Sequence, residues 1–332
     1  MWIAGEAKQR KERERSRIQN TMEGQNQTAV IEFILLGFSN HSKIQIVLFV
    51  IFLIIYMITL IGNTLIILLS RMDHHLQTPM YFFISNLSFL DIWYTSSIVP
   101  KMLENFLVEK KSISFNACMT QLYIHLSLGG TECYLLLSMA YDRYVAICKP
   151  LHYTNIMNRT VCIKLAACSW FGGTINSLIH TVFALQLTYC GPNKIDHFFC
   201  EVPAVLGMAC TDATMNKTVI FLCAIVVVMI PFFLILITYI RIISTILKIH
   251  SADGRQKVFS TCASHITVVS LFYGTIIFMY MRPGSSHSLH QDKMATLFYS
   301  VVTPMLNPLI YSLRNKDVKG ALIRITGRKI HL

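Results

Sequence analysis

The sequence predicts an all-α protein: a bundle of seven membrane-spanning helices followed by a short amphipathic helix. Of its 332 residues, 54% are hydrophobic and only 14% are charged, whereas soluble domains are usually about 25% charged. The charges are also unevenly placed, because seven long stretches are nearly free of Asp, Glu, Lys and Arg. Buried helices of a soluble core are the alternative, but seven such stretches in one chain favour a membrane protein.

Each stretch is long enough to cross a bilayer, which takes roughly 20 apolar residues at about 1.5 Å per residue. Only Asp91 and Glu132 interrupt them with a charge. We find no internal repeat, low-complexity linker or second domain in the sequence. The predicted spans are residues 44–70, 74–100, 112–141, 165–193, 218–240, 258–281 and 294–313.

The orientation follows from Lys and Arg, which concentrate in cytoplasmic loops. With a cytoplasmic carboxyl terminus, and leaving aside Arg143 and Lys164 at the ends of spans, the inner segments hold 13 of these residues. The outer segments hold 14 for the whole chain and eight when it is read from Met22. We therefore expect an extracellular tail (1–43), a transmembrane domain (44–313) and a cytoplasmic tail (314–332). Residues 1–21 lack the apolar core of a signal peptide; they are either an upstream extension outside the functional product or a tail too distant to govern insertion.

The outer side carries two further features. Asn26 begins the triplet Asn-Gln-Thr, an N-glycosylation acceptor that stands clear of the membrane. Four of the ten cysteines, Cys118, Cys190, Cys200 and Cys210, also lie outside, where disulfides form. Spacing alone allows three pairings of these four, and we expect the other six cysteines to be free.

The third span ends in two opposite charges, within the segment MAYDRYVAICKP (139–150). A charge in a membrane helix usually pairs with a partner or reaches water. Asp142 and Arg143 therefore indicate a function at the inner face, the alternative being a pair of interface charges that simply reach the headgroups.

Four longer strings carry a family resemblance: PMYFFISNLSFLD (79–91), MAYDRYVAICKPLHY (139–153), KVFSTCASH (257–265) and PMLNPLIYSLRNKDVKGAL (304–322). With DRY at 142–144 and NPLIY at 307–311, the chain resembles the rhodopsin-like G-protein-coupled receptors, and the four strings resemble the odorant (olfactory) receptors among them. The similarity spans about residues 26–322, nearly the whole chain.

The resemblance implies how the inner face works. Asp142 would hold Arg143 in the inactive receptor, and Arg143 would be freed when the sixth helix moves outward and a G-protein tail enters. Many rhodopsin-like receptors have an acidic partner for this arginine on the sixth helix, but this chain has Arg255 there. We therefore expect weaker contacts to keep it inactive. The implied activation residues are Asp142, Arg143, Tyr144, Tyr239, Asn307, Pro308 and Tyr311.

Two acids lie within the predicted bilayer at matching depth. Glu132 is 11 residues before Arg143, roughly 16 Å deeper, and Asp91 is 12 residues into the second helix, roughly 18 Å from its inner end. Two carboxylates that close in a low dielectric do not both ionise unless a cation or proton intervenes. With Asn63 and Asn307 at the same level, the group resembles the family's allosteric sodium site. A carboxylate pair for acid–base hydrolysis or a proton relay is the alternative.

The resemblance also implies a ligand pocket. It pairs Cys118 with Cys200 and Cys190 with Cys210, which would pin the second outer loop above helices 3, 5, 6 and 7. The predicted lining is apolar with a few polar groups, which suits a small volatile molecule. His125 could hydrogen-bond a ligand or, with a thiol odorant, hold a metal; a satisfied interhelical histidine is the alternative. The candidate ligand residues are His125, Gly129, Gly130, Cys133, Cys223, Val227, Tyr273, Ile277, Tyr280 and Leu297.

The resemblance implies an odorant receptor of the plasma membrane of olfactory cilia that activates a stimulatory olfactory-type G protein and raises cyclic AMP. Its expected partners are a small volatile odorant, the G protein, trafficking chaperones and membrane lipids, with no nucleic acid and no cofactor beyond a sodium ion. The sequence contains neither a paired-histidine metal motif nor a Gly-x-Ser-x-Gly elbow, either of which would suggest an enzyme. It also lacks the inverted repeat that would suggest a transporter or channel. A receptor for a metabolite outside olfactory tissue is the main alternative.

Overall fold

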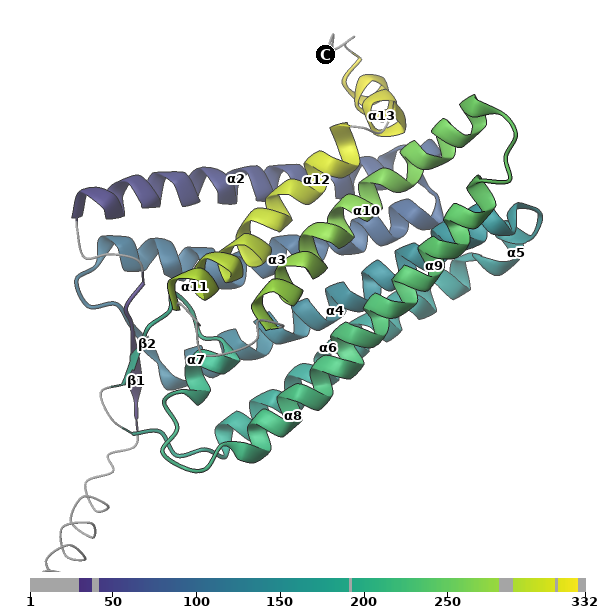
Figure 1. The fold of residues 1–332 in the computed structure, drawn as a ribbon. Coiled ribbons are helices and arrows are strands. Elements are labelled where there is room, and N and C mark those ends of the chain that lie inside the picture. Colours follow the sequence, from purple (N-terminus) through teal and green to yellow (C-terminus); the bar gives the residue numbers. More distant parts are fainter. Residues whose placement is uncertain (1–29, 38–41, 191–192, 281–288, 314–315, 328–332) are drawn as a thin grey trace, which may run out of the picture.

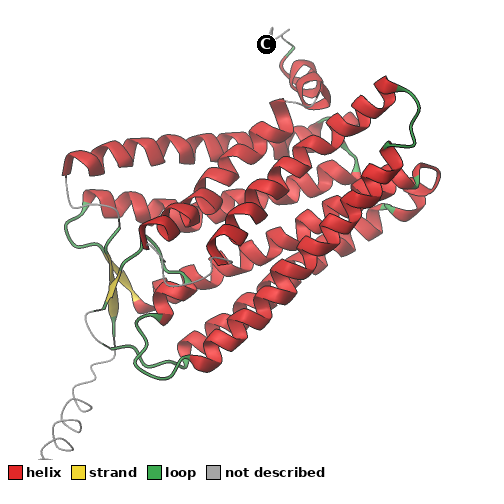
Figure 2. Ribbon diagram, in the orientation of Figure 1, coloured by secondary structure: helices red, strands yellow, loops and turns green. Residues whose placement is uncertain are grey.

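The computed structural model describes residues 30–37, 42–190, 193–280, 289–313 and 316–327, and in these residues seven long helical segments lie side by side (Figure 1). The helical bundle predicted from the charge-free stretches is confirmed, and Figure 2 shows how far helix dominates. In chain order the segments are α2 (Ser42–Met72), α3 (Pro79–Leu107), α4 (Phe115–Cys148), α6 (Arg159–Leu185), α8–η3–α9 (Thr214–Ala224, Ile225–Met229 and Ile230–Ile246), α10 (Ala252–Tyr280) and α11–η4–α12 (Leu289–Leu297, Phe298–Val302 and Thr303–Leu313).

The two ends of the bundle carry different short elements (Figure 1). The disulfide end has the strands β1, β2 and β3 and helix α7 (Val202–Leu206). The Arg143 end has η1 (His74–Leu76), η2 (Pro150–His152), α5 (Tyr153–Ile156) and α13 (Lys316–Thr326). Helix α13 buries Val318 and Ala321 while most of its other described residues are at least partly exposed, so the short amphipathic helix predicted after the bundle is present.

Polar side chains directly before three of the long helices cap their first turns. Thr78, Ser114 and Asn158 each accept a hydrogen bond from the backbone N–H three residues on, at the starts of α3, α4 and α6. Such caps satisfy one of the N–H groups that an α-helix leaves without a partner in its first turn. Their positions fix where each helix starts.

A small sheet at the disulfide end was not predicted. Strand β1 (Glu32–Leu35) pairs antiparallel with β2 (Ser112–Ser114) and parallel with β3 (Lys194–Ile195), in the order β2-β1-β3. Phe33 and Leu35 of β1 are fully buried. Part of the predicted amino-terminal tail is therefore built into the cover of the bundle.

The outside of the bundle is apolar. By length and composition alone, two helices qualify as membrane spans, Lys43–Met72 and Thr214–Ile246, and large hydrophobic side chains are exposed along both. Other helices carry more polar residues, among them Asp91 and Glu132, but both of these are fully buried. The polar side chains of the spans thus gather inside the bundle, as expected where the outer surface meets lipid.

Candidate functional site

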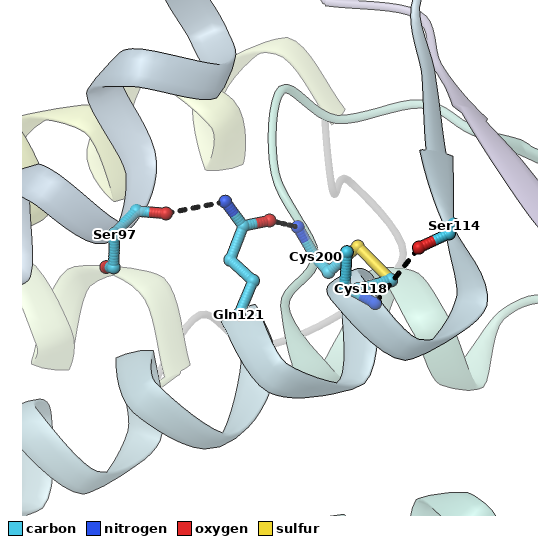
Figure 3. Close-up of a disulfide and its surroundings, with 6 residues drawn as sticks. Ser97, Ser114, Cys118, Gln121 and Cys200 are labelled. Atoms are coloured by element: carbon cyan, nitrogen blue, oxygen red, sulfur yellow. Dashed lines mark hydrogen bonds between the residues drawn. A yellow bond between two sulfur atoms is a disulfide. The ribbon is translucent and has the colours of Figure 1, made fainter.

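A disulfide joins the start of α4 to the loop above the bundle. Cys118 of α4 is bonded to Cys200, and Gln121 lies one turn below on the same helix (Figure 3). Gln121 Nε2 donates to the carbonyl of Ser97 on α3 at 2.8 Å, and Gln121 Oε1 accepts from the backbone N–H of Cys200 at 3.0 Å. One buried amide therefore couples two helices to the loop that the disulfide anchors.

The same loop is tied down at further points. Cys190 is bonded to Cys210, so both disulfides implied by the family resemblance are present. Lys293 of α11 forms an ion pair with Asp196 of the loop. The predicted glycosylation residue Asn26 lies outside the described residues.

A cavity of about 180 Å³ lies beneath this cover. Helix α6 contributes to its wall, which the sequence did not predict. Of the predicted ligand residues, those that line it are His125, Gly129, Gly130, Cys133, Cys223, Val227 and Ile277. Further lining residues are Tyr94, Leu126, Asn176, His180, Val202, Pro203, Ile220, Ala224, Val228, Met229, Phe272, Ile276 and Tyr299.

Two predicted ligand residues do not line this cavity. Tyr273 is buried, and its hydroxyl donates to the carbonyl of Cys133 at 3.4 Å, so it packs between α10 and α4. Leu297 packs in a separate apolar cluster with residues of α2 and α3, and Tyr299, two residues further on, supplies the wall instead. The rotation of each helix about its axis decides which side chain points inward. The side chain of Tyr280 lies outside what the structure describes.

The polar groups of the cavity are partly unsatisfied. His125 Nε2 lies 3.4 Å from the hydroxyl of Tyr94 and 3.2 Å from that of Tyr299, whereas its Nδ1 is buried with no partner among the described residues. Asn176 Oδ1 on α6 is likewise buried without a partner there, and His180 lies one turn further along that helix. Buried polar atoms without partners are rare, so a bound molecule with a polar group is a natural partner for them.

Two π-helical turns interrupt the helices at the level of the cavity. In η3 (Ile225–Met229), Val227 and Met229 line the cavity, and Pro231 follows directly. Proline has no N–H and its ring clashes with the carbonyl four residues earlier, which explains the widened turn. The second turn, η4 (Phe298–Val302), contributes Tyr299. Such turns often occur at functional sites.

A second group of polar residues lies deeper in the bundle and is buried. Asp91 accepts from Asn307 Nδ2 at 3.0 and 3.3 Å, and Asn63 Nδ2 donates to the carbonyls of Thr59 and Pro304. Glu132 is close enough to Asp91 for their carboxylates to interact electrostatically. The four residues predicted as a sodium site are thus brought together.

Their unsatisfied atoms are of the type that a hard cation binds. Both carboxylate oxygens of Glu132 and the amide oxygens of Asn63 and Asn307 are buried with no partner among the described residues. Carboxylate and amide oxygens are the ligands that hard cations take, and protonation of Glu132 would also satisfy an oxygen. In the described part of the chain, no group of three His, Cys, Asp or Glu residues is placed to hold a metal ion.

The Arg143 end shows a contact that the sequence did not predict. Asp142 is buried, and its Oδ1 accepts from the hydroxyl of Tyr153 on α5 at 2.9 Å. Among the described residues no ion pair joins Asp142 to Arg143, contrary to expectation. The carboxylate is oriented toward α5, although Arg143 remains near enough to interact electrostatically. Arg255 is exposed, and its position offers no acidic lock.

A buried histidine links three helices beside Arg143. His265 Nε2 of α10 lies 3.1 Å from the carbonyl of Leu136 on α4, and its Nδ1 lies 2.6 Å from the hydroxyl of Tyr239 on α9. A carbonyl only accepts, so Nε2 carries the proton and Tyr239 donates to Nδ1. Tyr239 and Tyr311 also lie within electrostatic reach of Arg143.

Sequence reasoning missed several of these residues, although signals existed. His265 stands in one of the four resembling strings, and Asn176 and His180 are polar residues one turn apart in a span without Asp, Glu, Lys or Arg. The remaining predicted activation residues are placed near the same end: Tyr144 packs against the core, and Pro308 lies against Gly62 of α2.

Comparison with known proteins places the chain in a family. The profile described as "Olfactory receptor" matches residues 52–329. Olfactory receptor 2G3 of Homo sapiens is 52% identical over 305 residues, covering 92% of this chain and 99% of that protein. Olfactory receptor-like protein OLF3 of Canis lupus familiaris is 54% identical (91% and 96% covered), and Olfactory receptor 2C1 of Mus musculus is 51% identical (92% and 98% covered). The chain therefore belongs to the olfactory receptor family, whose members are multi-pass G-protein-coupled receptors of the plasma membrane and not enzymes.

Proposed function

We propose that this receptor binds a small, neutral, volatile odorant in the cavity between α4, α6, α8 and α10. The unpartnered atoms His125 Nδ1 and Asn176 Oδ1 in an otherwise mostly apolar cavity carry this proposal. At about 180 Å³ the cavity lies below the usual range of roughly 300–1,000 Å³ for drug-sized ligands. Among the described residues that line it there is no carboxylate, so a cationic amine would lack a counter-ion.

Coupling would run from this cavity to the Arg143 end. Helices α4 and α10 line the cavity and also carry Leu136, Arg143 and His265. An outward movement of α10 would break the contacts of His265 with Tyr239 and Leu136 and open the surface beside Arg143 to a stimulatory olfactory-type G protein. Cyclic AMP would then rise. We place the amino terminus outside, with Asn26 glycosylated, the carboxyl terminus in the cytoplasm, and the receptor in olfactory cilia, where chaperones deliver it.

The first test measures cyclic AMP in cells that carry the chain from Met22, an olfactory-type G protein and a trafficking chaperone. A panel of small neutral volatiles is applied to the wild type, to Arg143→Ala and to the matched variants Cys223→Phe and Cys168→Phe. Cys223 lines the cavity and Cys168 is exposed on α6.

We expect a response in the wild type and in Cys168→Phe, none in Arg143→Ala, and a lost or altered ligand preference in Cys223→Phe, all at equal surface staining of an outward tag. An unchanged response of Arg143→Ala would refute the coupling route, and an unchanged ligand profile of Cys223→Phe would refute the cavity. Responses only to metabolites would favour a receptor used outside olfactory tissue.

The deeper polar group is proposed to hold a sodium ion or a proton that stabilises the inactive receptor. The unpartnered oxygens of Glu132, Asn63 and Asn307 support this proposal. Signalling is compared in sodium and choline chloride at equal ionic strength. Asp91→Asn and Glu132→Gln should each abolish any sodium sensitivity seen in the wild type, and sensitivity that survives both substitutions would exclude this site.

A further inference from the structure

A cavity larger than the ligand cavity lies on the outside of the bundle at the Arg143 end. It has a volume of about 900 Å³ and is bounded by α2, η1, α3, Met157 and α6. We call it the outer groove. Phe89 and Ile163, which line it, are about half exposed. In a membrane its open side faces lipid.

The length of the outer groove matches one leaflet of a bilayer. Arg159 is the first residue of α6, and Trp170 lies 11 residues further along that helix. At about 1.5 Å per residue these positions are roughly 16 Å apart. Half of a hydrocarbon core is about 15 Å, so the groove runs from the headgroup level to the middle of the membrane.

The rim of the outer groove carries two positive charges. Arg71 at the end of α2 and Arg159 at the start of α6 both line it and are both exposed. No Asp or Glu belongs to its described lining, and within the described chain neither arginine forms an ion pair. The nearby carboxylate of Asp73 is already bonded to Arg324, at 2.7 and 2.8 Å. Guanidinium groups bind phosphate through paired hydrogen bonds.

The deep end is mostly apolar, and its polar side chains include a hydrogen-bonded pair. Trp170 Nε1 donates to Asn86 Oδ1 at 3.2 Å, and Asn86 Nδ2 donates to the carbonyl of Phe82 at 2.9 Å. The rings of Phe89 and Trp170 meet edge to face at 6.0 Å. Because these polar atoms satisfy one another, the surface left for a bound molecule is mostly hydrocarbon and aromatic, with Ser85 as a small polar exception, which suits an acyl chain.

From the charge, length and lining together, we infer that the outer groove binds one anionic glycerophospholipid, with its phosphate on Arg71 and Arg159 and an acyl chain along Ile163 toward Trp170. The inference places this lipid in the cytoplasmic leaflet and to that extent rests on the proposed orientation. That leaflet is rich in anionic lipids. A zwitterionic phosphatidylcholine would bring its own positive choline group toward the two arginines, so we expect it to bind less well than an anionic lipid.

The test is native mass spectrometry of the whole receptor, released from nanodiscs of equal parts phosphatidylserine and phosphatidylcholine. The double variant Arg71→Gln/Arg159→Gln is compared with Lys164→Gln, which removes an exposed base of α6 that does not line the groove. Each Lys or Arg near an anionic membrane surface strengthens the binding of the protein to that surface by about 1 kcal/mol, or about fivefold. We therefore expect the preference of the wild type for phosphatidylserine to fall by about tenfold or more in the double variant and to persist in Lys164→Gln. Equal retention of both lipids by the wild type, or an equal loss in Lys164→Gln, would overturn the inference.

A second pair of variants tests the acyl chain. Ile163→Trp fills the groove, whereas Ile175→Trp enlarges an exposed side chain of the same helix outside it. We expect only Ile163→Trp to lose the retained lipid. If soluble glycerophosphoserine displaces the lipid completely, the headgroup alone binds and the groove has no role. Both measurements use receptor without odorant or G protein, in discs with identical leaflets, so they can succeed even where the cyclic AMP assay fails.

Discussion

Replacing Gly173 with alanine tests how closely α4 and α6 approach one another. A Cβ atom at Gly173 would lie 2.6 Å from the backbone N of Thr131 and closer still to Thr131 Oγ1 and the carbonyl of Ser127. The opposite glycine, Gly130, would place its Cβ 3.1 Å from the Cα of Gly173. Small residues let membrane helices pack backbone to backbone, and here they do so beside the ligand cavity.

The size of the effect follows from these distances. To bring 2.6 Å to the 3.4 Å of ordinary contact, the helices would have to separate by at least roughly 0.8 Å, and by more to clear the carbonyl of Ser127. Overpacking a core usually costs about 1–3 kcal/mol, and we expect the upper part of that range because backbone atoms cannot rotate away. Each kcal/mol of lost stability lowers the melting temperature of a large domain by about 2–4 °C. The melting temperature should therefore fall by about 5–10 °C.

The assay is thermal unfolding of the detergent-solubilised receptor, followed by the loss of its monodisperse peak on size-exclusion chromatography. Gly274→Ala is the control, since a Cβ there meets nothing within 4 Å; it should be neutral or slightly stabilising. Adding Thr131→Ala to Gly173→Ala removes only a side-chain contact and should not restore stability. A Gly173→Ala receptor as stable as the wild type, or full rescue by Thr131→Ala, would refute the backbone contact.

Three further predictions concern polar contacts. His265→Phe keeps a ring but loses the hydrogen bonds to Tyr239 and α4, so cyclic AMP without ligand should rise; an unchanged basal level would contradict the proposed coupling route. Gln121→Leu should reduce surface delivery more than Gln121→Glu, because the latter can still accept from the loop, and equal delivery would argue against the bridge. Burial opposes ionisation of Asp73, but hydrogen bonds from His75 and Arg324 outweigh it and lower the pKa of Asp73 to about 2. Its contribution to stability is therefore present above about pH 4 and lost only as the pH falls toward 2, so Asp73→Asn should lower the melting temperature equally at pH 5 and pH 8.

The polar group of Asp91 and Glu132 shows what can be predicted from sequence spacing and what cannot. Their depths follow from the constant rise of an α-helix, and their burial from the expense of a charge facing lipid. Both arguments hold before any helix is packed against another. Which oxygens lack partners depends on rotamers and on the neighbours Asn63 and Asn307, which only the folded bundle supplies.

Partners of single side chains were harder to predict. Adjacency in sequence suggested that Asp142 holds Arg143, yet neighbouring residues on a helix point in different directions. The carboxylate meets Tyr153 from a helix eleven residues later. Similarly, Leu297 was expected in the cavity wall, but the π-helical turn that follows it brings Tyr299 there instead.

By itself, the sequence determined the number and approximate limits of the spanning helices and, through four resembling strings, the family and its two disulfides. These properties depend on local composition, which decides what can enter a membrane, and on strings long enough to be specific. Tertiary structure alone decided the sheet that covers the bundle, the wall supplied by α6, the histidine link beside Arg143 and the outer groove. Each of these depends on how neighbouring helices are rotated and how closely their backbones approach, and contacts between residues far apart in the chain set both.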